Sequence, residues 1–197
     1  YAENVRQTAD RVILICQPPL VKILAGVAGI DQVVPMGQQP PRFDVHAPLL
    51  SLPHLLNLAE HEYFVRPYLH ADAALKEKWQ IRLAELSGLR VGICWRGNPE
   101  HLFNAQRSFA PANLAPLAKV KGVQLVSLQK GADDELASAD FKVLNLGADL
   151  DATAGPFMDS AAVIEQLDLV VSADTAVAHL AGGLGARVWL PLSAHAD

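Results

Sequence analysis

The stretch DLVVSADTAVAHLAGGLG, residues 168–185, decides the fold prediction. It opens with a short apolar run, which predicts a buried strand over 168–173. Small residues follow and predict a helix that closes on glycines. A buried strand leading directly into a helix is the repeating unit of α/β proteins with a parallel sheet. The same alternation is therefore expected in the rest of the chain.

Short apolar strands and helices of about ten residues alternate along both halves of the chain. This pattern indicates right-handed β-α-β units, and because it occurs twice we expect two Rossmann-like domains that face a cleft. The fold class predicted is therefore α/β. Besides 168–173, strands are expected at 11–17, 30–36, 43–50, 91–95, 123–129, 141–147 and 187–192. Besides the helix after residue 173, helices are expected at 18–27, 71–88, 113–120, 132–139 and 158–167.

The domain boundary is expected near Gly88, a glycine that can end the amphipathic helix over 71–88. Residues 1–88 then form an incomplete amino-terminal Rossmann-like domain, and residues 89–197 form a carboxyl-terminal one. The first residue is Tyr rather than Met, and residues 1–9 resemble the middle of a helix. We therefore expect the chain to be part of a longer polypeptide.

Composition and charge exclude several classes of partner. The formal net charge is -5 and no block of basic residues occurs, which argues against nucleic acid as a partner. No apolar stretch reaches the roughly 18–20 residues of a membrane span, and no signal peptide opens the chain.

Cys16 and Cys94 lie in apolar runs, which predicts two buried free thiols. A cytoplasmic location is the expectation.

Ligands of open parallel sheets bind beyond the carboxyl ends of the strands. Basic and polar residues occur in the loops that follow the expected strands at 91–95 and 123–129. An arginine directly after a buried strand can bind a phosphate through its planar fork, although a solvated loop arginine is an equally simple interpretation. The candidate binding residues in these two loops are Arg96, Asn98, Arg107, Ser108 and Lys130.

The turn that begins the helix after residue 173 supplies the remaining candidates. Asp174 stands at the expected N-cap, while Thr175 and His179 are four residues apart and share a helix face. Ala176 has almost no side chain, so a ligand could approach the backbone amides closely. The positive end of a helix dipole favours a phosphate there. The alternative is an ordinary capped helix that packs its small residues on the sheet.

Other motif classes find no support in the sequence. No G-x-G-x-x-G opens a helix after a strand, and neither a P-loop nor a G-x-S-x-G nucleophile elbow occurs. His195 and Asp197 form an H-x-D pair without a third ligand, so no metal site is expected.

Three runs of the sequence resemble the glycosyltransferase-like domain that follows tetratricopeptide repeats in many bacterial proteins. They are VGICWRGNP (91–99), QRSFAPANLAPLAKVKGVQLVSLQKG (106–131) and MDSAAVIEQLDLVVSADTAVAHLAGGLGARVWLPL (158–192). That domain is similar to the heptosyltransferases, family nine of the glycosyltransferases. Residues 1–34 and 43–56 match its amino-terminal half, and the pattern D-T-x-x-x-H-L-A-x-x-L-G at 174–185 is the most specific part.

The resemblance implies a GT-B fold whose second domain holds a nucleotide-sugar donor. It implies that Asp174, Thr175, the amides from Ala176 on and His179 lie against the donor's diphosphate and sugar. Arg96, Asn98 and Lys130 would lie near the phosphates or the base. GT-B enzymes typically need no metal, so no cofactor is expected beyond the donor substrate.

Two departures from the family pattern limit what the resemblance implies. Heptosyltransferases usually have Gly where this chain has Ala176. The Gly-rich loop whose acid is the expected general base belongs before Tyr1, so no catalytic residue is assigned.

Three functions are compatible with the sequence. The first is glycosyl transfer to a saccharide or protein acceptor. The second is a degenerate domain that binds a nucleotide, a sugar or a protein beside tetratricopeptide repeats. The third is another GT-B activity such as epimerisation. Epimerisation requires further acidic residues in the cleft, and the sequence does not show them.

Overall fold

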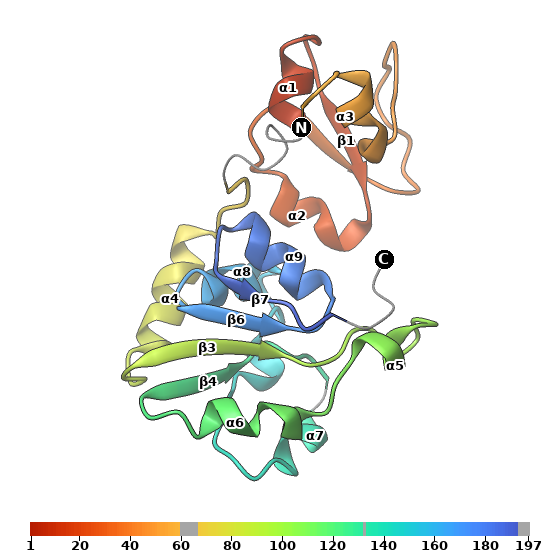
Figure 1. Cartoon of the computed structure of the whole chain (residues 1–197). Helices are drawn as coiled ribbons and strands as arrows, with labels where there is room; N and C mark the ends of the chain where they lie inside the picture. Colours follow the sequence, from red (N-terminus) through yellow and green to blue (C-terminus); the bar gives the residue numbers. More distant parts are fainter. Residues whose placement is uncertain (60–66, 132, 193–197) are drawn as a thin grey trace. The chain divides into compact units, whose positions relative to one another are not determined.

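The computed structural model describes residues 1–59, 67–131 and 133–192. The chain divides into two compact units, Tyr1–His70 and Ala71–Asp197. This division differs from the boundary expected near Gly88. The reason is that helix α4 (Ala73–Leu83) packs on helix α8 (Met158–Ile164), so the helix expected to join the units is part of the second one (Figure 1).

The first unit contains one β-α-β motif. Strand β1 (Ile13–Cys16) pairs in parallel with β2 (Gln32–Pro35), as the apolar runs predict. The connection contains a 3-10 turn, η1 (Pro18–Leu20), and helix α2 (Val21–Leu24). Ile23 of α2 and Val34 of β2 are buried. The remaining described elements are α1 (Ala2–Arg6), the 3-10 turn η2 (Leu49–Ser51) and α3 (Leu52–Leu55).

The strand expected over 43–50 is wrong. Within the described part of the chain these residues pair with no strand, and all of them are exposed, with Val45 86% accessible to solvent. An apolar run forms a strand only where a neighbour accepts its hydrogen bonds and buries one of its faces. Neither condition is met here, and η2 begins directly after Pro48.

The second unit is built on a parallel sheet of five strands in the order β5-β4-β3-β6-β7. Each pair of neighbours runs in parallel, which confirms the predicted α/β class. The strand order places β3 at the centre, between β4 and β6. The bounds are β3 (Leu89–Cys94), β4 (Val123–Ser127), β5 (Leu144–Asn145), β6 (Leu169–Ser172) and β7 (Val188–Trp189).

Helices cover both faces of this sheet (Figure 1). Helices α4, α8 and α9 (Ala176–Gly183) lie on one face, and α6 (Ala115–Ala118) and α7 (Asp133–Ala137) lie on the other. On the α6 face, Val91, Ile93 and Trp95 pack against Leu114 and neighbouring apolar side chains. The remaining elements are α5 (Asn104–Arg107) and the 3-10 turns η4 (Pro111–Leu114) and η5 (Gly147–Asp149).

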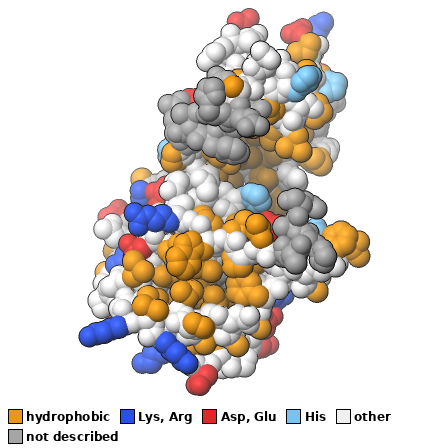
Figure 2. Space-filling view, in the orientation of Figure 1, with side chains coloured by type: hydrophobic (Ala, Val, Ile, Leu, Met, Phe, Trp, Pro, Cys, Tyr) orange, Lys and Arg blue, Asp and Glu red, His pale blue; other side chains and the backbone are white. Residues whose placement is uncertain are grey.

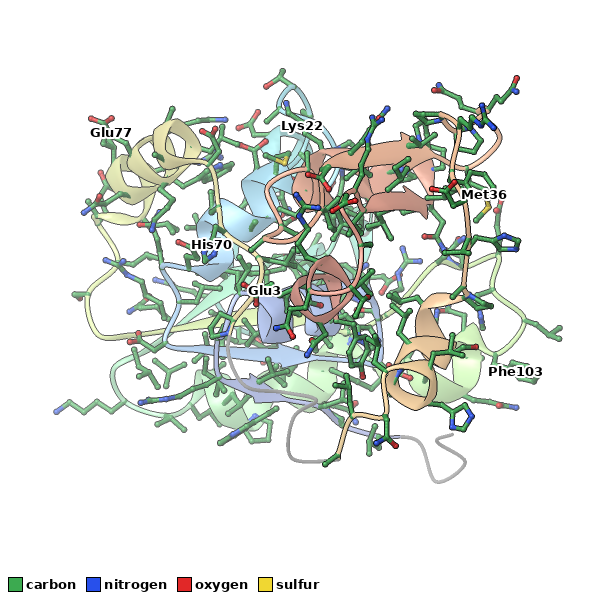
Figure 3. The ribbon with its side chains drawn as sticks, turned by 90° about the horizontal axis from the view of Figure 1, so that it is seen from above. Glu3, Lys22, Met36, His70, Glu77 and Phe103 are labelled. Carbon is green, nitrogen blue, oxygen red and sulfur yellow. The ribbon has the colours of Figure 1, made fainter. Side chains whose placement is uncertain are left out.

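Helix α4 is fixed to α8 by a buried carboxylate. Asp159 has no solvent-exposed surface, and its Oδ1 accepts hydrogen bonds from Trp79 Nε1 at 2.6 Å and Lys78 Nζ at 3.1 Å. Oδ1 is thus paired and hydrogen-bonded, as a buried carboxylate oxygen requires, whereas Oδ2 is buried without a hydrogen-bond partner among the described residues. Glu77 points away from the contact and is exposed (Figure 3). The α4–α8 contact therefore belongs to the second unit's core.

Hydrophobic side chains also gather on the surface of the second unit (Figure 2). Trp189 of β7 pairs with Val171 of β6 in the sheet register and so lies on the α6 face. Val171 is buried, whereas Trp189 is 58% exposed. The helices on this face thus cover the centre of the sheet and leave its β7 edge open to solvent.

Candidate functional site

The carboxyl ends of β3, β4 and β6 meet at one edge of the five-stranded sheet, as the strand order requires. Contacts between the loops confirm this convergence. Cys94, at the end of β3, places its sulfur 3.8 Å from the Thr175 hydroxyl, beyond β6. Arg96 Nη2 donates to the carbonyl oxygen of Gly131, beyond β4, at 2.8 Å. Three loops that are far apart in the sequence therefore form one surface.

The turn after β6 ends in a capped helix, but the capping residue is not the one expected. Thr175 is the N-cap of α9, and its hydroxyl accepts a hydrogen bond from the amide of Val177 at 3.3 Å. The expectation that Asp174 caps the helix is wrong. Thr175 is the residue that adopts the extended N-cap conformation, with φ -144° and ψ 171°. Its side chain is thereby turned into the protein, and the residue as a whole is 8% exposed.

Asp174 and His179 lie on the solvent side of the same turn. Their side chains are 44% and 82% exposed, and His179 Nε2 is 3.9 Å from Asp174 Oδ1. Ala176, the first residue of the helix, is exposed as well. The positive end of α9 is therefore accessible at Ala176, with a carboxylate and an imidazole beside it. A ligand at this turn would meet all three groups.

Arg96 is bound by acidic and carbonyl groups beyond β4. Its Nε lies 2.8 Å from Glu135 Oε1, and its Nη2 donates to Gly131. The second oxygen of Glu135 accepts a hydrogen bond from Trp95 Nε1 at 2.6 Å. We call Trp95, Arg96, Gly131 and Glu135 the Arg96 cluster. The expected phosphate-binding arginine is thus already paired with a carboxylate.

Gln129, beyond β4, links the carboxyl ends of β3 and β4 by hydrogen bonds. Its Oε1 accepts hydrogen bonds from the amides of Trp95 at 3.2 Å and Arg96 at 3.0 Å. These amides are therefore occupied and are poor candidates for ligand binding. Gln129 and Glu135 were not identified from the sequence. The signal for Gln129 is its place at the carboxyl end of the strand expected over 123–129.

The loop after β3 is organised by Asn104. Its Oδ1 accepts hydrogen bonds from the amide of Gly97 and the hydroxyl of Ser108, each at 3.1 Å. The guanidinium of Arg107 lies over Gly97, where a Cβ atom would be 2.9 Å from Arg107 Nη2. Asn98 makes a local turn, with its Oδ1 accepting from the amide of Glu100 at 3.1 Å. Asn98 and Ser108 thus have local roles in shaping the loop.

Two cations at this edge have no acidic partner among the described residues. Arg107 Nε is buried and has no hydrogen-bond partner among the described residues. Lys130 is exposed, and no acidic partner of its ammonium occurs in the ranges the structure describes. Cations without an acidic partner attract an anion. The tip of the same loop carries Phe103 (Figure 3). Its ring centroid is 6.2 Å from that of His101.

Both cysteines are buried free thiols, as predicted. Burial raises the pKa of the Cys94 thiol above its ordinary value of 9.0, and hydrogen bonds with Thr175 and Ser172 oppose the shift. Cys94 is therefore a neutral thiol that packs under the turn rather than a nucleophile. Burial raises the pKa of Cys16 too.

Two kinds of feature are absent from the described part of the chain. No three His, Cys, Asp or Glu side chains of that part form a cluster able to hold a metal ion. No helix in the same ranges has the length and apolar character needed to span a membrane. His195 and Asp197 lie outside the described residues.

Comparison with solved structures identifies the fold. A glycosyl transferase family 9 structure from Veillonella parvula matches 96% of this chain and 75% of its own, with a TM-score of 0.65 and 13% identity. The chain has the fold of glycosyltransferase family 9. The ADP-heptose heptosyltransferase II of E. coli also matches, over 100% of this chain and 83% of its own, with a TM-score of 0.62 and 11% identity. The resemblance seen in the sequence is confirmed for the GT-B fold.

Sequence comparison gives a second link. Protein FlbA of Caulobacter vibrioides is 31% identical over 164 residues, which cover 76% of this chain. The chain spans 26% of the length of FlbA, about a quarter of that protein. No family model matches the chain.

Proposed function

We propose that the second unit binds a nucleotide-sugar donor and that the protein transfers the sugar to an acceptor hydroxyl. One observation carries the proposal: in a glycosyltransferase family 9 fold, the accessible N-terminus of α9 stands at the carboxyl edge of the sheet, where Ala176 is exposed. Ligands of open parallel sheets bind at this edge, and helix N-termini favour phosphates.

The groups at the edge suit different parts of such a donor. The amide of Ala176 and the positive end of α9 would bind the diphosphate, together with Lys130 and Arg107. Asp174 and His179 are exposed beside that turn and would bind hydroxyl groups of the sugar or ribose. Thr175 would act through its backbone, because its hydroxyl already caps the helix. The donor would thus be bound by amides and cations without a metal ion.

The reaction itself is a displacement at the anomeric carbon of the sugar. The bond from that carbon to the diphosphate oxygen breaks, and the oxygen leaves with the electron pair. A bond to the acceptor oxygen forms, and the acceptor proton passes to a base. Positive groups that stabilise the leaving diphosphate lower the barrier. Lys130, Arg107 and the α9 dipole would have this role.

The test compares two exposed lysines that flank β4. Lys130 follows the carboxyl end of β4, and Lys121 precedes its amino end; both are exposed. Lys130→Ala should weaken binding of nucleoside diphosphates in calorimetric titration by about three- to tenfold. Lys121→Ala should bind as the parent does. Equal affinity of all three proteins would contradict the proposed site, and binding without sugar transfer would contradict the transfer activity.

A binding module without catalysis is the second candidate, and the Arg96 cluster favours it. A donor site that has already paired one of its arginines with Glu135 has fewer free charges to stabilise a leaving diphosphate. Such a domain would bind nucleotides or nucleotide sugars without turning them over. Incubation of the full-length protein with radiolabelled nucleotide sugars and saccharide or protein acceptors separates the two: transferred label supports the enzyme, and bound but unreacted donor supports the module.

A further inference from the structure

Glu135 contacts two residues at the carboxyl edge of the sheet. One of its oxygens is 2.8 Å from Arg96 Nε and the other accepts from Trp95 Nε1. Trp95 is 1% exposed, so its indole fixes the carboxylate in place. The Glu135 side chain is 41% exposed and the Arg96 side chain 19%, so the pair lies at the boundary between core and solvent.

The pairing of Arg96 with Glu135 is a charge contact rather than an aligned hydrogen bond. Although the Nε–Oε1 distance is short, Nε makes no hydrogen bond within the described part of the chain. A bidentate arginine–carboxylate pair would use two aligned N–H groups, and this one does not. The Arg96 guanidinium also keeps donors that neither Glu135 nor Gly131 occupies. The contact can therefore be exchanged for a better-aligned anion.

We propose that Glu135 is a specificity-determining residue that competes with the ligand's phosphate for Arg96. In the free protein Glu135 neutralises Arg96; a bound diphosphate takes over the guanidinium, and the Trp95 indole continues to fix the Glu135 carboxylate. The inference rests on the proposed function, since it concerns the same donor site. Because the carboxylate must be outcompeted, weakly charged anions would be excluded and a diphosphate favoured.

The consequence is that removing the charge of Glu135 strengthens anion binding. Glu135→Gln keeps an oxygen that can accept from Trp95 Nε1 but loses the negative charge beside Arg96. A negative charge within a few ångströms opposes an anion even when solvent screens part of the interaction. We expect Glu135→Gln to bind inorganic pyrophosphate about three- to tenfold more tightly than the parent protein.

Asp134→Asn is the matched control. It removes the same charge from the neighbouring position of α7, and Asp134 is exposed and contacts no residue of the Arg96 cluster through its side chain in the described structure. If the effect of Glu135→Gln were only a change in net charge, Asp134→Asn would reproduce it. The second comparison uses Arg96→Ala, in which Glu135→Gln should lose most of its effect because the two residues are coupled.

Calorimetric titration of the whole chain with pyrophosphate, and with a nucleoside diphosphate, decides between the outcomes. Tighter binding by Glu135→Gln than by Asp134→Asn, abolished in the Arg96→Ala background, supports the competition. Binding by the parent protein with no gain in Glu135→Gln, or an equal gain in Asp134→Asn, overturns the competition and leaves the donor site standing. No binding by any variant overturns the donor site and the competition together.

Discussion

The Thr175 hydroxyl oxygen lies 3.3 Å from the backbone nitrogen of Val177 and accepts its hydrogen bond. The same oxygen is 3.2 Å from the hydroxyl of Ser172, at the end of β6. One side chain thus caps α9 and joins the helix to the strand that precedes it. The buried Thr175 side chain holds the turn from its protein-facing side. Asp174 and Ala176 lie on its solvent-facing side.

Replacement of Thr175 should cost more stability than replacement of Asp174. Thr175→Ala loses the N-cap, and we expect the free energy of unfolding to fall by about 1–2 kcal/mol. Asp174→Ala removes an exposed carboxylate that caps nothing, so the change should stay within about 0.5 kcal/mol. Urea denaturation followed by circular dichroism measures both. A larger loss for Asp174→Ala would show that Asp174 stabilises the turn.

Removal of the buried carboxylate of Asp159 should destabilise the second unit. Asp159→Ala leaves Trp79 Nε1 without its acceptor, and we expect a loss of about 2–3 kcal/mol. Lys78 contacts the same carboxylate, but its side chain is 47% exposed, so Lys78→Ala should cost less than about 1 kcal/mol. Thermal and urea denaturation of the two variants provide the comparison. Equal losses would place the stabilisation in the ion pair rather than in the Trp79 hydrogen bond.

Two glycines should differ in how much stability their replacement by alanine costs. A Cβ at Gly92 would be 2.5 Å from Leu167 Cδ1 and 2.8 Å from Leu128 Cδ1, so Gly92→Ala overpacks the core and should cost about 1–3 kcal/mol. At Gly97 the nearest atom is Nη2 of the flexible Arg107 side chain, so Gly97→Ala should change stability by less than about 1 kcal/mol.

Replacement of Gly97 also tests ligand binding separately from folding. Gly97→Ala displaces the Arg107 guanidinium and should weaken nucleoside-diphosphate binding while the protein stays folded. Unchanged affinity of a folded Gly97→Ala variant would remove Arg107 from the donor site.

The buried thiol of Cys94 makes stability depend on pH in the alkaline range. Burial raises the pKa of Cys94 in the folded protein, so above the ordinary pKa of 9.0 the unfolded chain loses this proton first. The contribution of the neutral thiol is present below that pH and is lost as the pH rises through the folded pKa. Between pH 8 and pH 10.5 the parent protein should lose more unfolding free energy than Cys94→Ala. Equal losses of unfolding free energy in the two proteins over this pH range would contradict the raised pKa of Cys94.

The sequence predicts the strand–helix alternation of the second unit well because its strands are apolar and are followed by helices. The strands β3, β4 and β6 fall where the apolar runs VGIC, VQLVS and LVVS predict them. The failure over 43–50 has a physical reason: an apolar run does not show whether a partner strand is present to pair with it. The domain boundary depends on the packing of Trp79 against α8, which sequence periodicity does not contain.

The candidate site was predictable in its position but not in its contacts. The rule that ligands bind beyond the carboxyl ends of parallel strands brought Arg96, Lys130 and Asp174 to one edge. The pairing of Arg96 with Glu135 joins residues 39 apart in the chain and depends on how α7 packs. The choice between Asp174 and Thr175 as the N-cap depends on backbone angles that the sequence leaves open.

The central claim is that a nucleotide diphosphate binds at the turn where α9 begins, and amide chemical shifts test it most directly. Titration of ¹⁵N-labelled protein with nucleoside diphosphates should shift the amides of Asp174, Thr175 and Ala176 in a saturable manner, together with those of Lys130 and Gly131. Saturable shifts confined to other parts of the sheet, or no shifts with any nucleotide, would contradict the account.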